Sequence, residues 1–364
     1  MKTLLIIILS TVATFANTTV FIGTGDKGIY TATLDPSNGS LSEPKLAAEI
    51  NSSGFLAKHP KLPILYSTGE PEKGKGNVAA FTIEANGQLK ALGSQSTEGG
   101  RLCHISLDAS SKMLMGSNYR EGYVISYPIL KDGSIGNKAS KHNHKGSSVN
   151  PRRQKAPHAH SIYSGPDNKY AYAPDLGIDK VVIYQINPAS AELTPVGWAP
   201  SPAGAGPRHM KFGKDGKQAY VLNELTLSIS VYDRNPTTGT LTPTQVVSTL
   251  PDGESKEQRS CSEIRVSPDG KFIYCANRDL SDQGRDSLSV FKVGDKGKIT
   301  RLQTIAAEVW VPRNINLDPS GKWLIVAGQR SNDVPVFKID TTSGKLSYTG
   351  NKVTVPKAMC IEFQ

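Results

Sequence analysis

One sequence motif is repeated several times along this chain. It runs over Ile264–Arg278 as IRVSPDGKFIYCANR, and close copies occupy Met210–Glu224 and Ile315–Gln329. A looser copy covers Ser161–Asp175. Internal repetition at a regular period is typical of proteins built from stacked supersecondary units, so the repeat constrains the fold before any single residue is interpreted.

Each copy has the same layout: an alternating strand, a tight turn and an apolar strand that ends in a polar residue. A third and a fourth strand follow. Pro-Asp-Gly between apolar runs indicates a hairpin, since proline presets φ and glycine accepts positive φ. The spacings between the lysines that follow successive turns are 57, 48, 54 and 51 residues, for Lys112, Lys169, Lys217, Lys271 and Lys322. Four short antiparallel strands in this length are typical of a propeller blade.

The sequence predicts an all-β, seven-bladed β-propeller with four antiparallel strands per blade. Six blades are expected to begin near Ser53, Gly100, Pro157, Gly206, Ser260 and Val311. The stretch Thr18–Ile50 supplies only three strands, so its missing innermost strand is expected to be Met359–Phe363. Pairing the two ends of the chain in one blade would close the ring and protect strand edges. Two stacked β-domains are the alternative.

The amino-terminal segment predicts export. An apolar run, Leu4–Phe15, follows Lys2 and ends beside the small residue Ala16. It is short for a membrane span and has the layout of a secretory signal peptide. We therefore expect a signal peptide over residues 1–16, a single propeller domain over residues 17–364, and a periplasmic or secreted protein with no membrane segment after cleavage. A retained membrane anchor is the alternative.

The cysteine spacing and the charge distribution limit which metals and partners the protein is expected to bind. The four cysteines lack metal-ligand spacing, and Cys275 and Cys360 are expected to be buried thiols, while a Cys103–Cys261 bridge is disfavoured. The formal net charge is +10, but no basic stripe carries interleaved aromatic residues, which argues against nucleic-acid binding. The basic segments 141–145 and 152–155 are either a loop or a lid over an anionic substrate.

Propeller geometry predicts where chemistry would lie. The first strand of a blade lines the channel and the second returns antiparallel, so strand-one starts and strand-two ends meet at one mouth. Strand-one starts carry His158, His160, Arg208, His209, Glu263 and Arg313. Strand-two ends carry Asp175, Glu224, Arg278 and Gln329. Buried charges need partners, so such a cluster is either a polar plug or a site.

The residue types favour proton transfer with oxyanion stabilisation. Histidine can activate water near neutral pH, and arginine can brace a developing alkoxide. The sequence contains no Gly-x-Ser-x-Gly, His-Glu-x-x-His or phosphate-loop motif. Opening a cyclic ester needs a group that transfers the proton and a cation that stabilises the oxyanion, and histidine and arginine are suited to these two roles.

The blade-five motif resembles a known family. Gly206–Met210 and Ala219–Leu225 are similar to the signature of the propeller-type 6-phosphogluconolactonases, which are related to fungal muconate cycloisomerases. Glu263–Arg278 and Pro312–Gln329 resemble the family's blades six and seven, and His160 matches its blade-four histidine.

The resemblance implies a metal-independent lactonase with no cofactor that acts on a small-molecule sugar δ-lactone. The substrate would be 6-phosphogluconolactone or an unphosphorylated aldonolactone, and we expect a monomer. The catalytic residues implied are His160, Arg208, Glu224 and Arg278. Either His160 or Glu224 would be the general base, and the two arginines would polarise the lactone carbonyl. Substrate-binding residues would be His158, Asp175, His209, Glu263, Arg313 and Gln329.

Three other functions remain open. Phrases such as Tyr220–Asn223 also resemble envelope propellers that bind a ligand or partner without catalysis. A muconate-type lactonizing cycloisomerase would use the same base without water. A calcium-dependent gluconolactonase would need carboxylate and amide oxygens at the channel centre, where arginines are expected instead.

Overall fold

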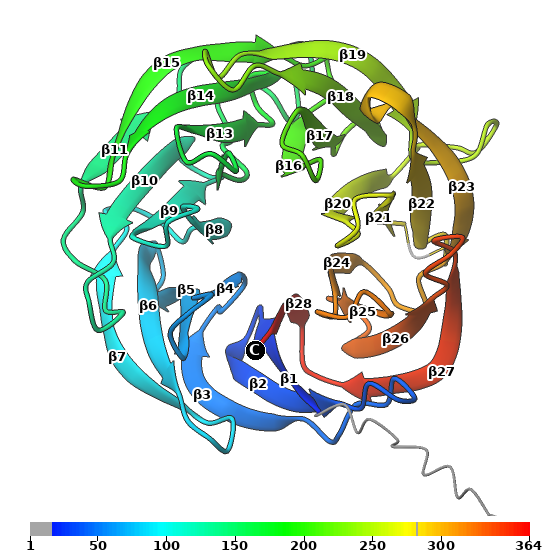
Figure 1. Ribbon diagram of the computed structural model, residues 1–364, viewed down its shortest axis with the longest axis horizontal. Helices are drawn as coiled ribbons and strands as arrows, with labels where there is room; N and C mark the ends of the chain where they lie inside the picture. Colours follow the sequence, from blue (N-terminus) through cyan, green and yellow to red (C-terminus); the bar gives the residue numbers. More distant parts are fainter. Residues whose placement is uncertain (1–16, 282) are drawn as a thin grey trace, which may run out of the picture.

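The chain folds into a ring of β-sheets. A computed structural model describes residues 17–281 and 283–364, and its seven sheets surround a central axis (Figure 1). Each sheet has four antiparallel strands, so the predicted seven-bladed propeller is confirmed. Within these two ranges the only helical element is the 3-10 turn η1 (Asp295–Gly297). The predicted signal peptide, residues 1–16, lies outside the described part of the chain.

The blades are numbered in chain order, and each runs from its inner to its outer strand. Blades one to three are β28 (Ala358–Phe363), β1 (Thr18–Thr24), β2 (Lys27–Leu34) and β3 (Lys45–Asn51); β4 (Leu56–Lys58), β5 (Ile64–Glu72), β6 (Lys75–Ile83) and β7 (Leu89–Ser96); and β8 (His104–Leu107), β9 (Met113–Asn118), β10 (Tyr123–Pro128) and β11 (Ser140–Asn143).

Blades four to seven follow the same order. They are β12 (Tyr163–Ser164), β13 (Tyr170–Asp175), β14 (Lys180–Asn187) and β15 (Glu192–Pro200); β16 (Pro207–Phe212), β17 (Gln218–Asn223), β18 (Ser228–Arg234) and β19 (Leu241–Ser248); β20 (Arg259–Val266), β21 (Phe272–Asp279), β22 (Ser287–Val293) and β23 (Ile299–Ala306); and β24 (Pro312–Leu317), β25 (Trp323–Gly328), β26 (Asp333–Ile339) and β27 (Leu346–Thr354).

The ring closes where the two ends of the chain meet. Strand β28 pairs antiparallel with β1, with Phe363 opposite Val20 and Ile361 opposite Ile22. This strand is the innermost of blade one, as the sequence predicts (Figure 1).

The repeated turn explains why the strands fold back so regularly. In blade six, Gly270 adopts φ +78°, and its N–H donates to the carbonyl of Ser267 at 2.8 Å. The Asp269 carboxylate accepts the N–H of Lys271 at 3.0 Å, which completes the hairpin between β20 and β21. The apolar residues of these strands are buried between neighbouring sheets, so each blade holds its inner strand firmly against the axis.

The basic segment before blade four is more ordered than a simple loop. Residues 140–143 form β11, which pairs with β10 and completes blade three. His144 then lies against Asp175, with Nδ1 and Oδ2 2.6 Å apart, and its Nε2 lies 2.7 Å from the Tyr184 hydroxyl. The expectation of a loop is therefore wrong for this part, because the open edge of β10 is satisfied by pairing.

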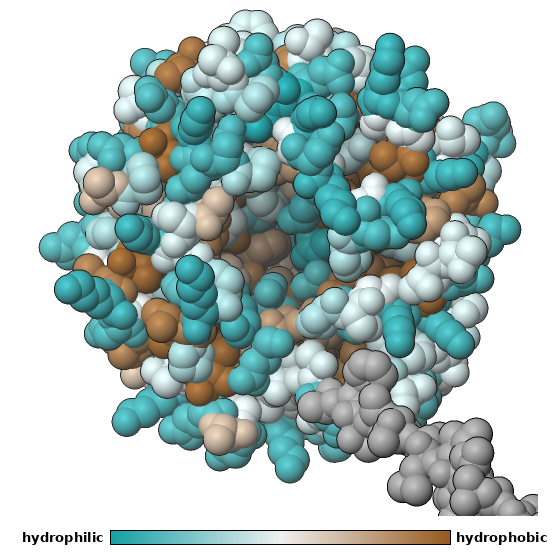
Figure 2. Space-filling model, viewed as in Figure 1, coloured by the Kyte–Doolittle hydropathy of each residue, from teal (hydrophilic) through white to brown (hydrophobic). Residues whose placement is uncertain are grey.

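The remaining compositional expectations can be checked directly. All four cysteines are free thiols, and Cys275 and Cys360 are buried, as predicted. Over the described ranges, no helix has the length and apolar character that crossing a membrane requires. Figure 2 shows one face of the ring, which is hollowed near its centre and bordered by hydrophilic side chains.

Candidate active site

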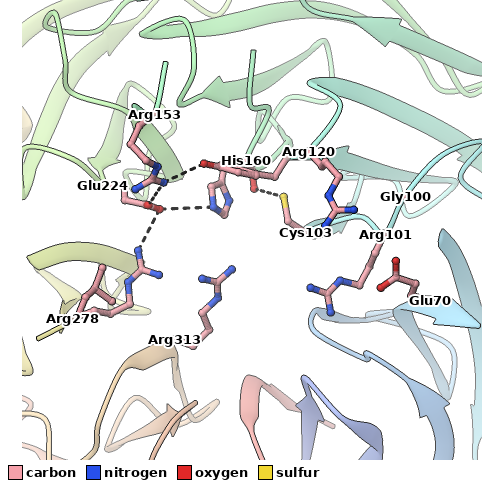
Figure 3. Close-up of a pocket in the computed structure, with 12 residues that line it drawn as sticks. Glu70, Gly100, Arg101, Cys103, Arg120, Arg153, His160, Glu224, Arg278 and Arg313 are labelled. Carbon is pink, nitrogen blue, oxygen red and sulfur yellow. Dashed lines mark hydrogen bonds and ion pairs between the residues drawn. The ribbon is translucent and has the colours of Figure 1, made fainter. Parts of the chain in front are cut away.

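A cavity of about 420 Å³ opens at one end of the ring axis (Figure 3). It lies where strand-one starts and strand-two ends meet, because the antiparallel pairing of β16 with β17 brings Pro207 opposite Asn223. Its wall consists of Glu70, Gly100, Arg101, Cys103, Tyr119, Arg120, Arg153, His160, Glu224, Arg278, Leu280 and Arg313. Four residues predicted for the site therefore line one cavity: His160, Glu224, Arg278 and Arg313.

Glu224 is the hub of the cavity. Its Oε2 lies 2.9 Å from Arg208 Nε and 3.2 Å from Arg278 Nη2, and its Oε1 lies 2.7 Å from Arg153 Nη2. Burial alone would raise the pKa of Glu224, but the guanidinium groups of Arg278 and Arg208 outweigh it and hold the pKa well below its usual range. The carboxylate is consequently ionised and almost fully occupied by cations.

His160 stands beside this carboxylate as a neutral imidazole. Its Nε2 lies 3.7 Å from Glu224 Oε2, and its buried Nδ1 has no hydrogen-bond partner among the described residues. Burial and then the Arg208 cation hold the pKa of His160 well below its ordinary value. The nearby carboxylate favours a proton on Nε2, which leaves the lone pair on Nδ1.

Arg208 supports the cavity from behind. Its side chain is 2% exposed, and its Nη1 donates to the carbonyl of Ser262 and lies 3.1 Å from His209 Nε2. Its Nε holds Glu224, so Arg208 touches the cavity through that carboxylate rather than lining it. The structure therefore brings Arg208 next to the other three predicted catalytic residues.

Three further arginines face the same space without a carboxylate partner in the described ranges. Arg101, Arg120 and Arg313 project their guanidinium groups toward the centre of the cavity in Figure 3. Burial and the neighbouring Arg208 and Arg278 cations lower the pKa of Arg313 to about 9. Such a guanidinium is poised for a negatively charged group.

His209 and Glu263 lie elsewhere, contrary to the expected convergence. His209 Nδ1 lies 3.0 Å from Glu263 Oε1, Arg265 Nη1 lies 2.7 Å from the same oxygen, and Asn314 Nδ2 donates to Oε2 at 2.6 Å. Neither His209 nor Glu263 lines the cavity. Each residue along a strand adds about 3.3 Å, so inward-facing residues further along β16 and β20 lie deeper in the ring.

Asp175 and His158 act as supports. Asp175 is fully buried, and its Oδ1 accepts the backbone N–H of His158 at 2.7 Å. The His158 ring stacks on Tyr119 with centroids 4.4 Å apart, and its Nδ1 donates to the Tyr119 carbonyl at 2.7 Å. Gln329 bonds Val311 through its backbone, and its side chain is not part of the cavity wall.

Sequence reasoning missed several wall residues, and most of them carried a signal. Tyr119 and Arg120 directly follow β9, the second strand of blade three, just as Glu224 follows β17. The expectation that strand-two ends lie at the channel mouth would have identified them if the sequence of blade three had matched the repeat as closely as that of blade five. Arg153 belongs to the basic segment 152–155, which the sequence offered as either a loop or a lid over an anionic substrate. Arg101 and Cys103 lie at the start of blade three, just before β8, whereas Leu280 had no distinguishing pattern.

The wall does not resemble a cation site. Among the residues that the structure describes, no group of three or more histidine, cysteine, aspartate or glutamate side chains could hold a metal ion. The wall contains five arginines against two glutamates, Glu70 and Glu224, so its charge favours an anion.

Known proteins that are similar to this chain include two 6-phosphogluconolactonases and one gluconolactonase. The chain is 35% identical over 349 residues to the 6-phosphogluconolactonase of Bacillus subtilis (strain 168), covering 94% of this chain and 97% of that protein. A 6-phosphogluconolactonase of Formosa agariphila is 31% identical over 331 residues, covering 87% and 91%. The solved structure of the Pseudomonas aeruginosa periplasmic gluconolactonase has a TM-score of 0.88 and 27% identity, covering 96% of this chain and 99% of that one.

The family assignment rests on nearly the whole chain. Residues 14–363 match the family model described as lactonase, 7-bladed beta-propeller. The expectation of a lactonase, which is a carboxylic ester hydrolase, is confirmed at the level of the family. With its blades, its closing strand and its arginine-rich cavity accounted for, the chain belongs to the seven-bladed β-propeller lactonase family.

Proposed function

We propose that this protein hydrolyses a sugar δ-lactone to the open-chain sugar acid without a metal ion. The observation that carries the proposal is a neutral His160, with a free Nδ1, beside an ionised Glu224 in a cavity lined by guanidinium groups. The names of the relatives from Bacillus subtilis and Formosa agariphila support the reaction class.

In the proposed mechanism His160 is the general base. Both oxygens of Glu224 are engaged by arginines, and its depressed pKa makes it a weak proton acceptor. The His160 imidazole, which lines the cavity, takes a proton from water as the water oxygen bonds to the lactone carbonyl carbon. The carbonyl electrons move to its oxygen. When the ring C–O bond breaks, the protonated imidazole returns the proton to the leaving alkoxide.

The Arg278 guanidinium stabilises the charge that develops during this step. It reaches the cavity from blade six and is a cation in a partly buried space. A guanidinium directed at the tetrahedral oxyanion stabilises the transition state more than the neutral lactone, which is what catalysis requires. Glu224 balances part of this positive charge and helps to keep the arginines in place.

The wall charge favours a substrate with an anionic substituent. Of the two lactones considered, 6-phosphogluconolactone carries a phosphate that the unpaired Arg101, Arg120 and Arg313 could bind. We propose that the active unit is a monomer of the single domain 17–364. An exported location is part of the proposal, and the Pseudomonas aeruginosa neighbour is itself periplasmic by name.

The first test measures the hydrolysis of lactones by a protein that consists of residues 17–364. Glucono-δ-lactone and 6-phosphogluconolactone are compared with and without a chelator, and spontaneous opening is subtracted. Chelator-resistant turnover, faster on the phosphorylated lactone, is the expected result. Absence of turnover on both would contradict the proposal and favour a non-catalytic binding propeller, whereas formation of a lactone from an open acid would favour a cycloisomerase.

A further inference from the structure

The connection between blades three and four sends one side chain into the cavity. We infer that Arg153 is a positioning residue for Glu224, and that Asp179 joins the turn carrying Arg153 to the loop that leads into Arg208. This inference rests on the proposed function, because it explains how the proposed site is held in its working geometry.

The turn over residues 148–154 is built as a closed unit. The Gln154 N–H donates to the Asn150 carbonyl at 2.8 Å, and the Asn150 N–H donates to Gln154 Oε1 at 2.9 Å. Asn150 Oδ1 also accepts the N–H groups of Arg152 and Arg153. The Gln154 side chain is fully buried and donates to the Leu176 carbonyl at 2.8 Å. These bonds fix the direction in which Arg153 leaves the turn.

Arg153 grips the oxygen of Glu224 that the other arginines leave free. Its Nη2 lies 2.7 Å from Glu224 Oε1 and donates to the Tyr119 hydroxyl at 3.0 Å. Within the described ranges no other side chain bonds Oε1, whereas Oε2 contacts Arg208, Arg278 and His160. Two-sided holding stops rotation of the carboxylate and so keeps Oε2 beside the imidazole.

Tyr119 extends this support to the proposed base. Its ring lies edge-on to His160, with centroids 5.1 Å apart, and stacks on His158. Arg153 therefore touches two neighbours of His160, Glu224 and Tyr119, while its own side chain is 37% exposed. It is the one arginine on Glu224 that reaches in from the solvent side.

Asp179 anchors the turn and the blade-five loop together. Its Oδ2 accepts the Ser148 hydroxyl at 2.5 Å and the Gly204 N–H at 2.7 Å, and its Oδ1 accepts the Gly206 N–H at 2.7 Å. The Gly206 carbonyl in turn accepts the Glu224 N–H at 2.8 Å. One buried carboxylate thus sets the relative position of Arg153 and of the backbone that carries Arg208 and Glu224.

The test compares two adjacent arginines of this turn. R153A should lower kcat on glucono-δ-lactone by about 10- to 100-fold, since small misplacements of catalytic groups cost that much. R152A removes the same charge from the same turn, but the Arg152 side chain is exposed and does not line the cavity, so kcat should stay within about twofold of the parent. R153K should recover part of the loss, because it restores charge without the planar fork.

Chemical rescue separates positioning from folding. Guanidinium chloride, below concentrations that shift the melting temperature, should restore R153A, because the site of the lost group is open to solvent. S148A cuts only the turn's bond to Asp179 and should lower kcat less than R153A. Equal kcat for R153A and R152A, or a loss without guanidinium rescue, would overturn the inference.

A second readout does not depend on turnover. The changes in the free energy of unfolding caused by R153A and by E224Q should not add up to the change in the double variant. The changes caused by R152A and E224Q should add up. Additivity in the first cycle would overturn the inference even in a protein without measurable lactonase activity. A parent protein inactive on every lactone, with the coupling intact, would instead contradict the proposed function alone.

Discussion

Two clusters in this ring contain the same three kinds of side chain and differ in what they can do. At the mouth, Glu224 lies against Arg208 and His160; deeper, Glu263 lies against Arg265 and His209. The deep carboxylate is fully buried, and both its oxygens accept hydrogen bonds from groups that are themselves held. The mouth cluster borders a cavity and leaves His160 Nδ1 without a partner.

The comparison teaches that chemistry depends on unsatisfied groups and access, more than on residue type. The deep cluster is a closed network, which stabilises the ring by cross-linking blades five, six and seven. The mouth cluster concentrates cations around a space that a ligand can enter.

The largest effect is expected from the deep cluster, on stability. E263A would leave Arg265 and His209 buried without their shared acceptor, at a cost of about 3–5 kcal/mol in the free energy of unfolding. Denaturant unfolding would measure it. E224A should cost less, because its partners Arg153 and Arg278 line the cavity and can be reached by water there; an equal or greater loss in E224A would contradict the distinction.

Next in size are the mouth residues, on turnover. H160A removes the proposed base and R208A removes the cation that holds Glu224, so each should lower kcat by about 100-fold or more while the fold is kept. Circular dichroism and kinetics with either lactone would measure this. H142A, which alters a histidine of β11 outside the cavity wall, serves as the control. Near-normal rates in both site variants would refute the assignment.

A smaller effect is expected from the unpaired Arg313. R313Q should raise the KM for 6-phosphogluconolactone by about tenfold and change that for glucono-δ-lactone little, because a charge-assisted hydrogen bond to phosphate is lost. The variant also relieves repulsion with Arg208 and Arg278, so its melting temperature should not fall. Equal changes in KM for the two lactones would show that Arg313 does not serve a phosphate.

The smallest effect is expected on mild acidification. The pKa of His160 is held well below 6.5, so its basic form persists and kcat/KM should stay almost constant between pH 7.5 and 6.5. A base with an unshifted pKa would be half protonated at pH 6.5 and would lose nearly half of its kcat/KM over this interval. The free energy of unfolding should also fall on acidification. His104, His160 and His209 all have lowered pKa values in the folded protein, so their contribution to stability is present above about pH 6.5 and is lost as the pH falls below it.

The fold could be predicted from the sequence because its information is local and repeated. Each Pro-Asp-Gly turn specifies a hairpin, and hairpins place Glu224 beside the start of the strand that carries Arg208. Depth along the axis could not be predicted, since Arg208 and His209 are adjacent in sequence yet serve different layers across a register shift. The segment 152–155 was considered as a lid, but the contact of Arg153 with Glu224 could not be predicted, because its turn is held by side-chain bonds that follow no strand period.

The closing strand has a consequence for how the protein is made. Synthesis proceeds from the amino terminus, and β28 is the last strand of the ring to leave the ribosome, although its partner β1 is the first of the described strands. Blades two to seven can therefore pair as they emerge, while blade one keeps an open edge until β28 has been made. A chain that ended before residue 358 would contain every wall residue of the cavity but would lack the β28–β1 pairing that closes the ring.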